Sequence, residues 1–416
     1  MPSLIAAIQD AERSPEVDAR TVLRPAPKPV ADESGPAVPE VLASFDAPAT
    51  ARAADSYAQL LVQRVDDEHF TLSVQHKDDS AVKRIGETYN RPGISLGELA
   101  ASRQRGGADF NPQKLYNLML IWSQQMWEQE TPELLGWLQD LRFTIGDDKL
   151  RMVIWDTTGF DIPWEMLLVP AGETPSSCPA GLLGGLLAVS RRISGRQATG
   201  EAAQYAEHAC RGRLLAYVEE EMAADRKILP GYDAGAVGNL GELLDRLETA
   251  PGTLGLVYVA CHGHWAEEVS DLLLGDIQYA EIALHPLPAL SRSRAVVFLN
   301  ACHAGRLLWD PRLNSGVYGF ARAFVQRGAD VVIGPTGLVE TGLAGRIAAD
   351  ILAQVTRKPS PPLAAALAQV RAKIAQRVAG QRRPAKEDLK ELIYTFMYVC
   401  YGNPYATLEL PSGDRQ

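Results

Sequence analysis

The sequence predicts an α/β fold in which helices cover both faces of a mostly parallel sheet. Three apolar runs in the second half of the chain are typical of buried parallel strands: residues 213–218, 254–259 and 295–300. Segments with helical periodicity lie between predicted strands. Strands that alternate with helices indicate a mostly parallel sheet with helices on both sides.

The first 55 residues differ in composition from the rest of the chain. They are rich in Ala, Pro, Asp and Glu, and six prolines lie from Pro25 to Pro48. Such a segment buries too little apolar surface to offset the conformational entropy lost on folding. We therefore predict a disordered tail over residues 1–55.

Between residues 56 and 204 the pattern predicts strands and two capped helices. Residues 69–75 alternate apolar and polar side chains, as a half-buried strand does. Helices are predicted to begin at Pro112 and Pro132, because a good capping residue, Asn or Thr, precedes each proline. A further strand is expected at residues 150–155.

From residue 205 onward, strands and helices alternate more regularly. Residues 239–248 place four leucines on one helical face. The basic residues between Arg371 and Lys390 are expected to form a solvated helix face and loop. The remaining predicted elements are a helix at 317–327 that ends before Gly328, a strand at 330–333, helices at 341–357 and 362–378, a charged loop at 380–390 and a closing segment at 396–410.

Composition limits the class of protein and its partners. The 416 residues, 46% apolar and 22% charged, are typical of a soluble globular chain of about two to three domain-sized units. A formal net charge of −10 disfavours nucleic-acid binding, and five cysteines without regular spacing favour a reducing compartment. The first residues do not resemble a signal peptide, and the longest apolar run, 181–189, is too short to span a membrane. We predict a cytoplasmic protein that binds neither nucleic acid nor membranes.

Two of the predicted strands end in chemically reactive residues. The strand at 254–259 leads into ACHGHW at 260–265, and the strand at 295–300 runs into NACHAG at 300–305. The carboxyl ends of parallel strands meet at one edge of a sheet, where ligand crevices lie. His262 and Cys302 should therefore face the same crevice, as a cysteine nucleophile and its base require.

These two strand ends resemble the His-Gly and Ala-Cys signals of the CHAT domain, which belongs to the caspase, separase and metacaspase clan of cysteine peptidases. Three further stretches are similar to blocks of this family: FDIPWEMLLV at 160–169, GADVVIGPTG at 328–337 and FMYVCYGNPYATLEL at 396–410. All occur in the family's order, over about residues 140–410. The first hundred residues carry no such match.

The resemblance implies a caspase-like cysteine endopeptidase that hydrolyses peptide bonds of a specific protein. It implies a peptidase half at residues 205–412 and a related, degenerate, non-catalytic half at 56–204. The family's catalytic histidine directly precedes a glycine, which selects His262 over His264. In bacteria such proteins are often tied to defence or regulated cell death, with a protein substrate and an activating partner protein.

The chemistry of thiol catalysis assigns roles to three residues. The thiolate of Cys302 would attack the peptide carbonyl, and the imidazolium of His262 would protonate the leaving amine. Gly263 has no side chain, so its backbone N–H can approach the developing oxyanion together with the N–H of Cys302. Cys261 is expected to be a small buried apolar residue.

Substrate recognition is less closely specified by the sequence. Because clan members that cleave after basic residues need a carboxylate in the pocket, Asn300, which stands where metacaspases have Asp, leaves an apolar or mixed pocket equally open. Glu267 and Glu268 either orient a histidine or form a solvated pair. The residues assigned to substrate binding are His264, Asn300, His303, Asp276 and Asp310.

Two alternative functions stay open. A zinc-dependent hydrolase would use the soft ligands that converge on the crevice, but their spacing matches no finger or ribbon and no HExxH is present, so we expect no metal and no cofactor. The main alternative is an inactive CHAT scaffold that binds a partner protein, which the presence of both His262 and Cys302 disfavours. Trp164 and Glu165 are expected to be a core aromatic residue and a structural ion pair or cap. The zinc ligands in question are Cys261, His262, His264, Cys302 and His303.

Overall fold

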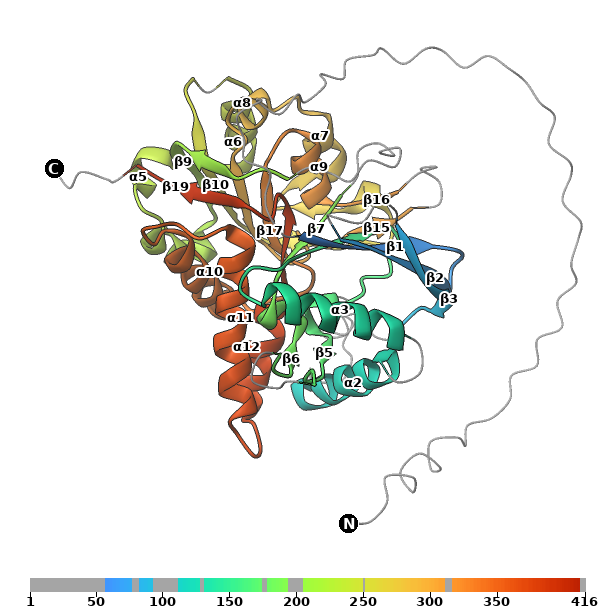
Figure 1. The fold of residues 1–416 in the computed structure, drawn as a ribbon. Helices are drawn as coiled ribbons and strands as arrows, with labels where there is room; N and C mark the ends of the chain where they lie inside the picture. The colour runs from blue at the N-terminus through green and yellow to red at the C-terminus, as the bar shows by residue number, and fades with distance from the viewer. Residues whose placement is uncertain are drawn as a thin grey trace, which may run out of the picture. The chain divides into compact units, whose positions relative to one another are not determined.

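A computed structural model describes residues 57–76, 82–92, 111–127, 131–173, 178–193, 205–249, 251–310 and 316–411 (Figure 1). The predicted tail at residues 1–55 lies outside the described residues. Residues 194–204, which end at the predicted boundary between the two halves, lie outside them as well. No helix in the described residues is long and apolar enough to cross a membrane.

One large sheet runs through the described part of the chain. Its strands follow the spatial order β3-β2-β1-β4-β7-β18-β17-β14-β10-β9. The fold is therefore the predicted α/β class with a mostly parallel sheet. In that order the strands are β3 (Lys83–Asn90), β2 (His69–His76), β1 (Tyr57–Arg64), β4 (Arg151–Asp156), β7 (Ala188–Arg191), β18 (Tyr398–Gly402), β17 (Val331–Pro335), β14 (Val296–Asn300), β10 (Leu254–Ala260) and β9 (Arg213–Val218).

The large sheet consists of two parallel blocks that run in opposite directions. Strands β9, β10, β14 and β17 are parallel to one another and form the second block. Strands β1, β4, β7 and β18 are also mutually parallel and form the first block, with β2 and β3 added antiparallel at its outer edge. The blocks join where β18 pairs antiparallel with β17, in a register that sets Ile333 opposite Cys400.

Strands of the second block are buried on both faces. In β10 the side chains of Leu256, Tyr258 and Ala260 pack into one core cluster. Val257 and Val259, which alternate with them, pack into a second cluster. A strand that is apolar at every position is what burial on both faces requires.

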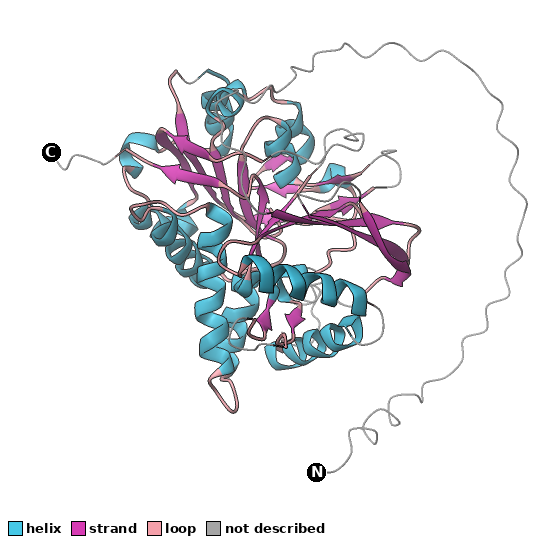
Figure 2. Cartoon of the chain, viewed as in Figure 1, coloured by secondary structure: helices cyan, strands magenta, loops and turns pink. Residues whose placement is uncertain are grey.

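Helices supply the two covering layers (Figure 2). One core cluster is closed by α6 (Leu240–Thr249), α7 (Tyr279–Leu284), α8 (Pro288–Ser293) and α9 (Phe320–Gln326). The other is closed by α2 (Pro112–Gln125), α3 (Pro132–Ile145), α10 (Thr341–Val355), α11 (Leu363–Ala379) and α12 (Lys386–Met397). All four predicted leucines of α6 are buried, which confirms its apolar face.

Short elements complete the fold. The helical ones are α4 (Leu183–Leu186), α5 (Tyr232–Gly235), η3 (Trp164–Met166), η4 (Glu220–Ile228) and η5 (Val269–Asp271). The paired short strands are β5 (Leu168–Val169) with β6 (Gly181–Leu182), β8 (His208–Arg211) with β19 (Ala406–Glu409), β11 (Gly263–His264) with β12 (Leu273–Leu274), β12 with β13 (Ile277–Gln278), and β15 (Leu308–Trp309) with β16 (Val317–Tyr318).

Three sequence-based expectations are wrong in detail. The helix predicted at 317–327 begins at Phe320, because residues 317 and 318 pair with β15 instead. The loop predicted at 380–390 ends early, because α12 begins at Lys386. Arg371, which we expected on a solvated helix face, is fully buried.

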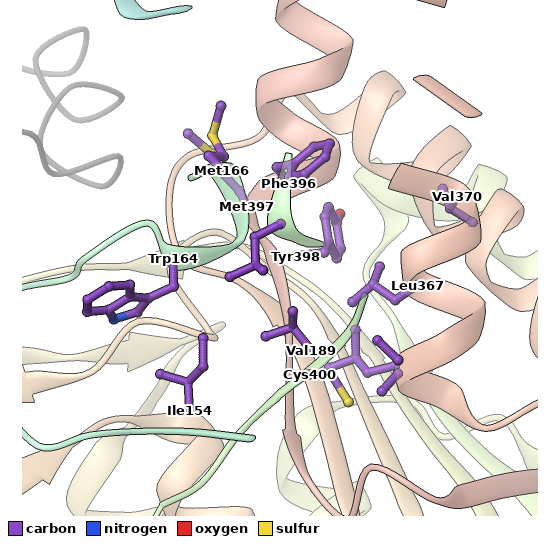
Figure 3. Packing of buried hydrophobic residues seen from close by; sticks show 14 of the residues in the cluster. Ile154, Trp164, Met166, Val189, Leu367, Val370, Phe396, Met397, Tyr398 and Cys400 are labelled. Carbon is purple, nitrogen blue, oxygen red and sulfur yellow. The ribbon is translucent and has the colours of Figure 1, made fainter. Parts of the chain in front are cut away.

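The core around η3 joins distant parts of the chain (Figure 3). Trp164 is fully buried there, and Phe396 and Leu367 belong to the same apolar cluster. The neighbouring Glu165 forms a buried ion pair with Arg191 of β7, at 2.5 Å. Both expectations for Trp164 and Glu165 are therefore confirmed.

Candidate active site

A cavity of about 310 Å³ opens where β10 and β14 of the second block end. Both residues that the sequence predicts as catalytic line it. The remaining wall comes from η4, from the end of β17 and the segment after it, from the start of α10 and from the first residue of β18. Its lining residues are Met222, Cys261, His262, Gly263, Asn300, Ala301, Cys302, Pro335, Leu338, Val339, Glu340, Thr341, Ala344 and Tyr398.

The two strand ends approach each other closely because residue 263 is glycine. A Cβ atom placed on Gly263 would collide with the backbone carbonyl of Cys302. The preceding Cys261 is fully buried, as predicted. The side chain of His262 is 57% exposed, so it can move at the mouth of the cavity. Gly263 thus lets the histidine strand end lie directly against the backbone of the candidate nucleophile.

The thiol of Cys302 is held by one residue of the segment after β17. Its Sγ lies 3.6 Å from the carbonyl oxygen of Val339 and 3.5 Å from the N–H of the same residue. Burial raises the pKa of the Cys302 thiol, and the hydrogen bond from Val339 offsets this only in part. Within the described residues no hydrogen bond joins this sulfur to His262.

Two glutamates that the sequence analysis missed hold His262 instead. The ring Nε2 lies 2.7 Å from a carboxylate oxygen of Glu221, and the backbone N–H of His262 donates to Glu219 at 2.9 Å. Both glutamates follow β9, the strand next to β10. An acidic run directly after a neighbouring parallel strand was the available signal. Glu267 and Glu268, the predicted candidates for this contact, are exposed.

A buried carboxylate lies against the polar side of the cavity. Asp225, from η4, is 3% exposed and accepts hydrogen bonds from Asn300 and Tyr258, both at 2.7 Å. The Tyr398 hydroxyl donates to the other end of the Asn300 amide at 2.5 Å. No cation in the described residues forms an ion pair with Asp225. An Asp at position 300 would bring a second carboxylate against this one, whereas Asn donates to it.

Four of the predicted substrate-binding residues are not among those that line the cavity. His264 and Asp276 are exposed on the β11–β13 sheet and its turn. Asp310 is 4% exposed and lies beyond β15. His303 is 3% exposed and packs near the Trp265 ring, with 6.0 Å between ring centroids. Of the substrate-binding set, the structure therefore brings only Asn300 together with the cavity.

His303 adopts an unusual backbone conformation. Its φ of 60° lies in the left-handed region, which residues other than Gly rarely adopt, although Asn, Asp and His do so more often than the rest. Burial, and then the nearby Arg306 guanidinium, lower the pKa of His303 to about 4. This histidine is therefore neutral in the folded protein over most of the physiological pH range.

One cluster in the described residues has the spacing of a metal site. Ligand atoms of His208, Cys210 and Asp330 lie within 4.8 Å of one another. Arg294 and Asn403 already bind the Asp330 carboxylate, as His208 does, so its charge is compensated without a metal. None of the five residues weighed as zinc ligands in the sequence belongs to this cluster.

The comparison with known proteins agrees with this architecture. A family model described as the CHAT domain matches residues 131–394. Two crystal structures of the Saccharomyces cerevisiae separase–securin complex, at 2.6 and 3.0 Å resolution, are similar, with TM-scores of 0.47 and 0.50 at 9% and 10% sequence identity. Each match covers 85% of this chain and 30% of the separase chain. No curated protein matches the sequence.

The second of these structures shares the fold of this chain, and at such low identity the likeness extends to the fold alone. The family model spans well over half of the residues and includes both predicted catalytic residues and every lining residue of the cavity except Tyr398. The chain therefore belongs to the CHAT domain family, with a caspase-like protease fold of the kind found in separase.

Proposed function

We propose that this protein is a cysteine endopeptidase in which His262 and Cys302 form the catalytic dyad. The observation that carries the proposal is their convergence. A histidine and a cysteine from the ends of two neighbouring parallel strands line one cavity of about 310 Å³. Ligand crevices of parallel sheets lie at this position.

The dyad would act by proton exchange between its two members. The imidazole of His262 takes the proton of the Cys302 thiol, and the thiolate attacks the peptide carbonyl. The imidazolium then returns the proton to the leaving amine. The N–H groups of Gly263 and Cys302 would stabilise the oxyanion, and removing one such donor typically costs roughly two to three orders of magnitude in rate.

The buried carboxylate of Asp225 supports a preference for substrates with a basic side chain before the scissile bond. Within the described residues the Asp225 carboxylate is held by the neutral side chains of Asn300 and Tyr258 and has no cationic partner. A buried carboxylate without a counter-ion is costly. A lysine or arginine side chain could lay its apolar stem along Met222 and Ala344 and bring its charge toward Asp225. Asp225 lies behind the cavity wall, in contact with the lining residue Asn300. The sequence offered Asp276 and Asp310 for this role, and neither of them lines the cavity.

The substrate would be a specific protein, and an activating partner protein would control the activity. A role in bacterial defence or regulated cell death is inferred from the family resemblance. A cytoplasmic location is inferred from the five irregularly spaced cysteines. All five cysteines are free thiols, as expected in a reducing compartment.

A binding scaffold without catalysis is the second candidate function. One observation favours it: the thiol and the imidazole are each hydrogen-bonded to other groups, Val339 and Glu221. Such a protein would use the same cavity to bind a peptide and would not cleave it.

Peptide-library cleavage mapped by mass spectrometry separates the two. The wild-type chain should cleave, with Lys or Arg preceding the cut, and Cys302→Ala should cleave nothing. Cys261→Ser, a change in the buried neighbouring cysteine, should retain cleavage, and Asp225→Asn should lose the basic preference. Binding of peptides by wild type and Cys302→Ala alike, with no cleavage by either, would establish the scaffold.

A further inference from the structure

The two groups of the proposed dyad are held by different partners in the folded chain. Cys302 Sγ faces both the N–H and the carbonyl of Val339, so this one residue supplies both a hydrogen-bond donor and an acceptor to the thiol. The Nε2 atom of His262 is occupied by Glu221. Neither group needs the other to satisfy its hydrogen bonds.

The segment that carries Glu221 is fixed to the end of β10 through Glu219. The N–H of Glu219 donates to the carbonyl of Ala260 at 2.9 Å, while the Glu219 carboxylate accepts from the N–H of His262 at 2.9 Å. The start of η4 is thereby tied to the end of β10. Glu221 sits two residues further on, where its side chain can hold the imidazole ring.

The contact itself is weak and open to solvent. The side chains of His262 and Glu221 are 57% and 73% exposed. Exposed ion pairs contribute little to stability, because water screens them and two flexible side chains must be fixed. A modest input of binding energy from a partner or substrate is therefore enough to break this contact.

The restraint on Cys302 is anchored as well. The segment from Thr336 to Glu340 carries Val339 across the thiol. Its first residue donates from the backbone to the carbonyl of Met397 at 2.9 Å. At its far end, Glu340 forms an ion pair with Lys390 of α12 at 2.6 Å. The thiol is thus kept in place, ready for a base that is held elsewhere.

We propose that Glu221 is an intramolecular restraint that holds the His262 ring away from Cys302, so that the free chain rests in a restrained form. This inference rests on the proposed dyad. When the ion pair opens, the His262 ring turns toward the sulfur and the Cys302 S–H proton moves to its nitrogen. A thiolate and an imidazolium result, and no other reactant is consumed.

The rate of Cys302 alkylation by iodoacetamide, followed by peptide mass spectrometry, tests the restraint without any peptide substrate. Glu221→Ala should raise this rate roughly two- to fivefold, the range that an exposed ion pair can supply. The gain should vanish in the double variant Glu221→Ala/His262→Ala. Glu220→Ala is the matched control, because it removes the adjacent exposed carboxylate, which pairs with Arg226 instead.

An unchanged or slower alkylation rate in Glu221→Ala would overturn the proposal, and a slower rate would mark Glu221 as a group that orients the base. A gain that persists without His262 would also overturn it. Faster alkylation without cleavage of any peptide would leave the restraint standing and refute the peptidase. Cleavage of peptides by the wild type, with an alkylation rate unaffected by Glu221→Ala, would support the peptidase and refute the restraint.

Discussion

At the scale of single residues, the surroundings of His303 disfavour the charged form of its imidazole. Its pKa falls to about 4, first because of burial and then because of Arg306, whereas an unfolded histidine titrates near 6.5. The unfolded chain therefore binds one proton more than the folded chain between these pH values. Stability that is fully present above pH ~6.5 is lost as the pH falls toward about 4, by up to roughly 1.4 kcal/mol per pH unit.

We expect His303→Asn to remove this loss, because Asn does not titrate and tolerates the left-handed backbone. Urea unfolding at several pH values between 7 and 4 should show a shallower acid decline than in the wild type. His264→Asn should leave most of the acid decline in place, because burial and Arg306 lower the pKa of His303 more than His264 does. Parallel pH profiles for wild type and His303→Asn would contradict the prediction.

The residues of the candidate site divide by how they reach it. His262, Gly263 and Cys302 lie directly after apolar strands, so local pattern and parallel-sheet geometry predicted their convergence. Glu221 contacts His262 from η4, and Val339 contacts Cys302 from the segment after β17. The acidic run after β9 was a signal for Glu221, but which of its carboxylates meets His262, and where Val339 lies, depends on how separate strands pair.

At the scale of elements, α2 shows a cap that the sequence predicted correctly. The Asn111 side chain accepts a hydrogen bond from the N–H of Lys114 at 3.1 Å, with Pro112 as the first helical residue. Thr131 holds the matching position before α3, but its hydroxyl donates to the carbonyl of Met126 instead. The two similar sequence signals therefore correspond to different interactions.

We expect Asn111→Ala to lower the free energy of unfolding by about 1 kcal/mol, because the N–H of Lys114 loses its partner. Asn111→Ser, which can still cap the helix, should retain most of that stability. Urea denaturation of the full chain measures both. Equal losses in the two variants would show that the cap contributes nothing.

The predicted element boundaries were wrong where strand pairing or charge determined them. Residues 317 and 318 were predicted as helix, yet they pair with β15 of the loop after Cys302, a contact that periodicity does not reveal. The start of α12 was readable in principle. Glu387 and Asp388 lie in its first turn, where negative charge is favoured by the helix dipole.

At the scale of the whole molecule, buried charges connect the segments that flank the sheet. Glu165 of η3 pairs with Arg191 of β7, while the buried Arg371 of α11 donates to the carbonyl of Tyr398. Burial lowers the pKa of Arg371 to about 10, with Glu165 opposing this fall. One carboxylate therefore serves two buried guanidinium groups.

Glu165→Gln should lower the free energy of unfolding by about 3–5 kcal/mol, since both arginines would stay buried without a counter-ion. Arg371→Met removes one buried cation and should cost much less, because it leaves the Glu165–Arg191 pair intact. Thermal and urea unfolding of the full chain compare them. A larger loss in Arg371→Met would show that its bond to the Tyr398 carbonyl outweighs the electrostatic effect.

The fold class and most strands were predictable, because apolar runs and helical periodicity are local. The reversal of direction between the two blocks was not. It arises from the pairing of β17 with β18, in which the paired residues Ile333 and Cys400 lie 67 positions apart in the sequence. Pairing between such distant segments leaves no mark on local composition or periodicity.

The position of β18 also sets an order of events during synthesis. This strand lies between β7 and β17, yet the ribosome makes it after every other strand of the large sheet. The other strands of both blocks emerge before β18, which unites the blocks, and Tyr398, part of the cavity wall, arrives with β18. A nascent chain that has not yet reached β18 holds His262 and Cys302 already, but in an unfinished cavity.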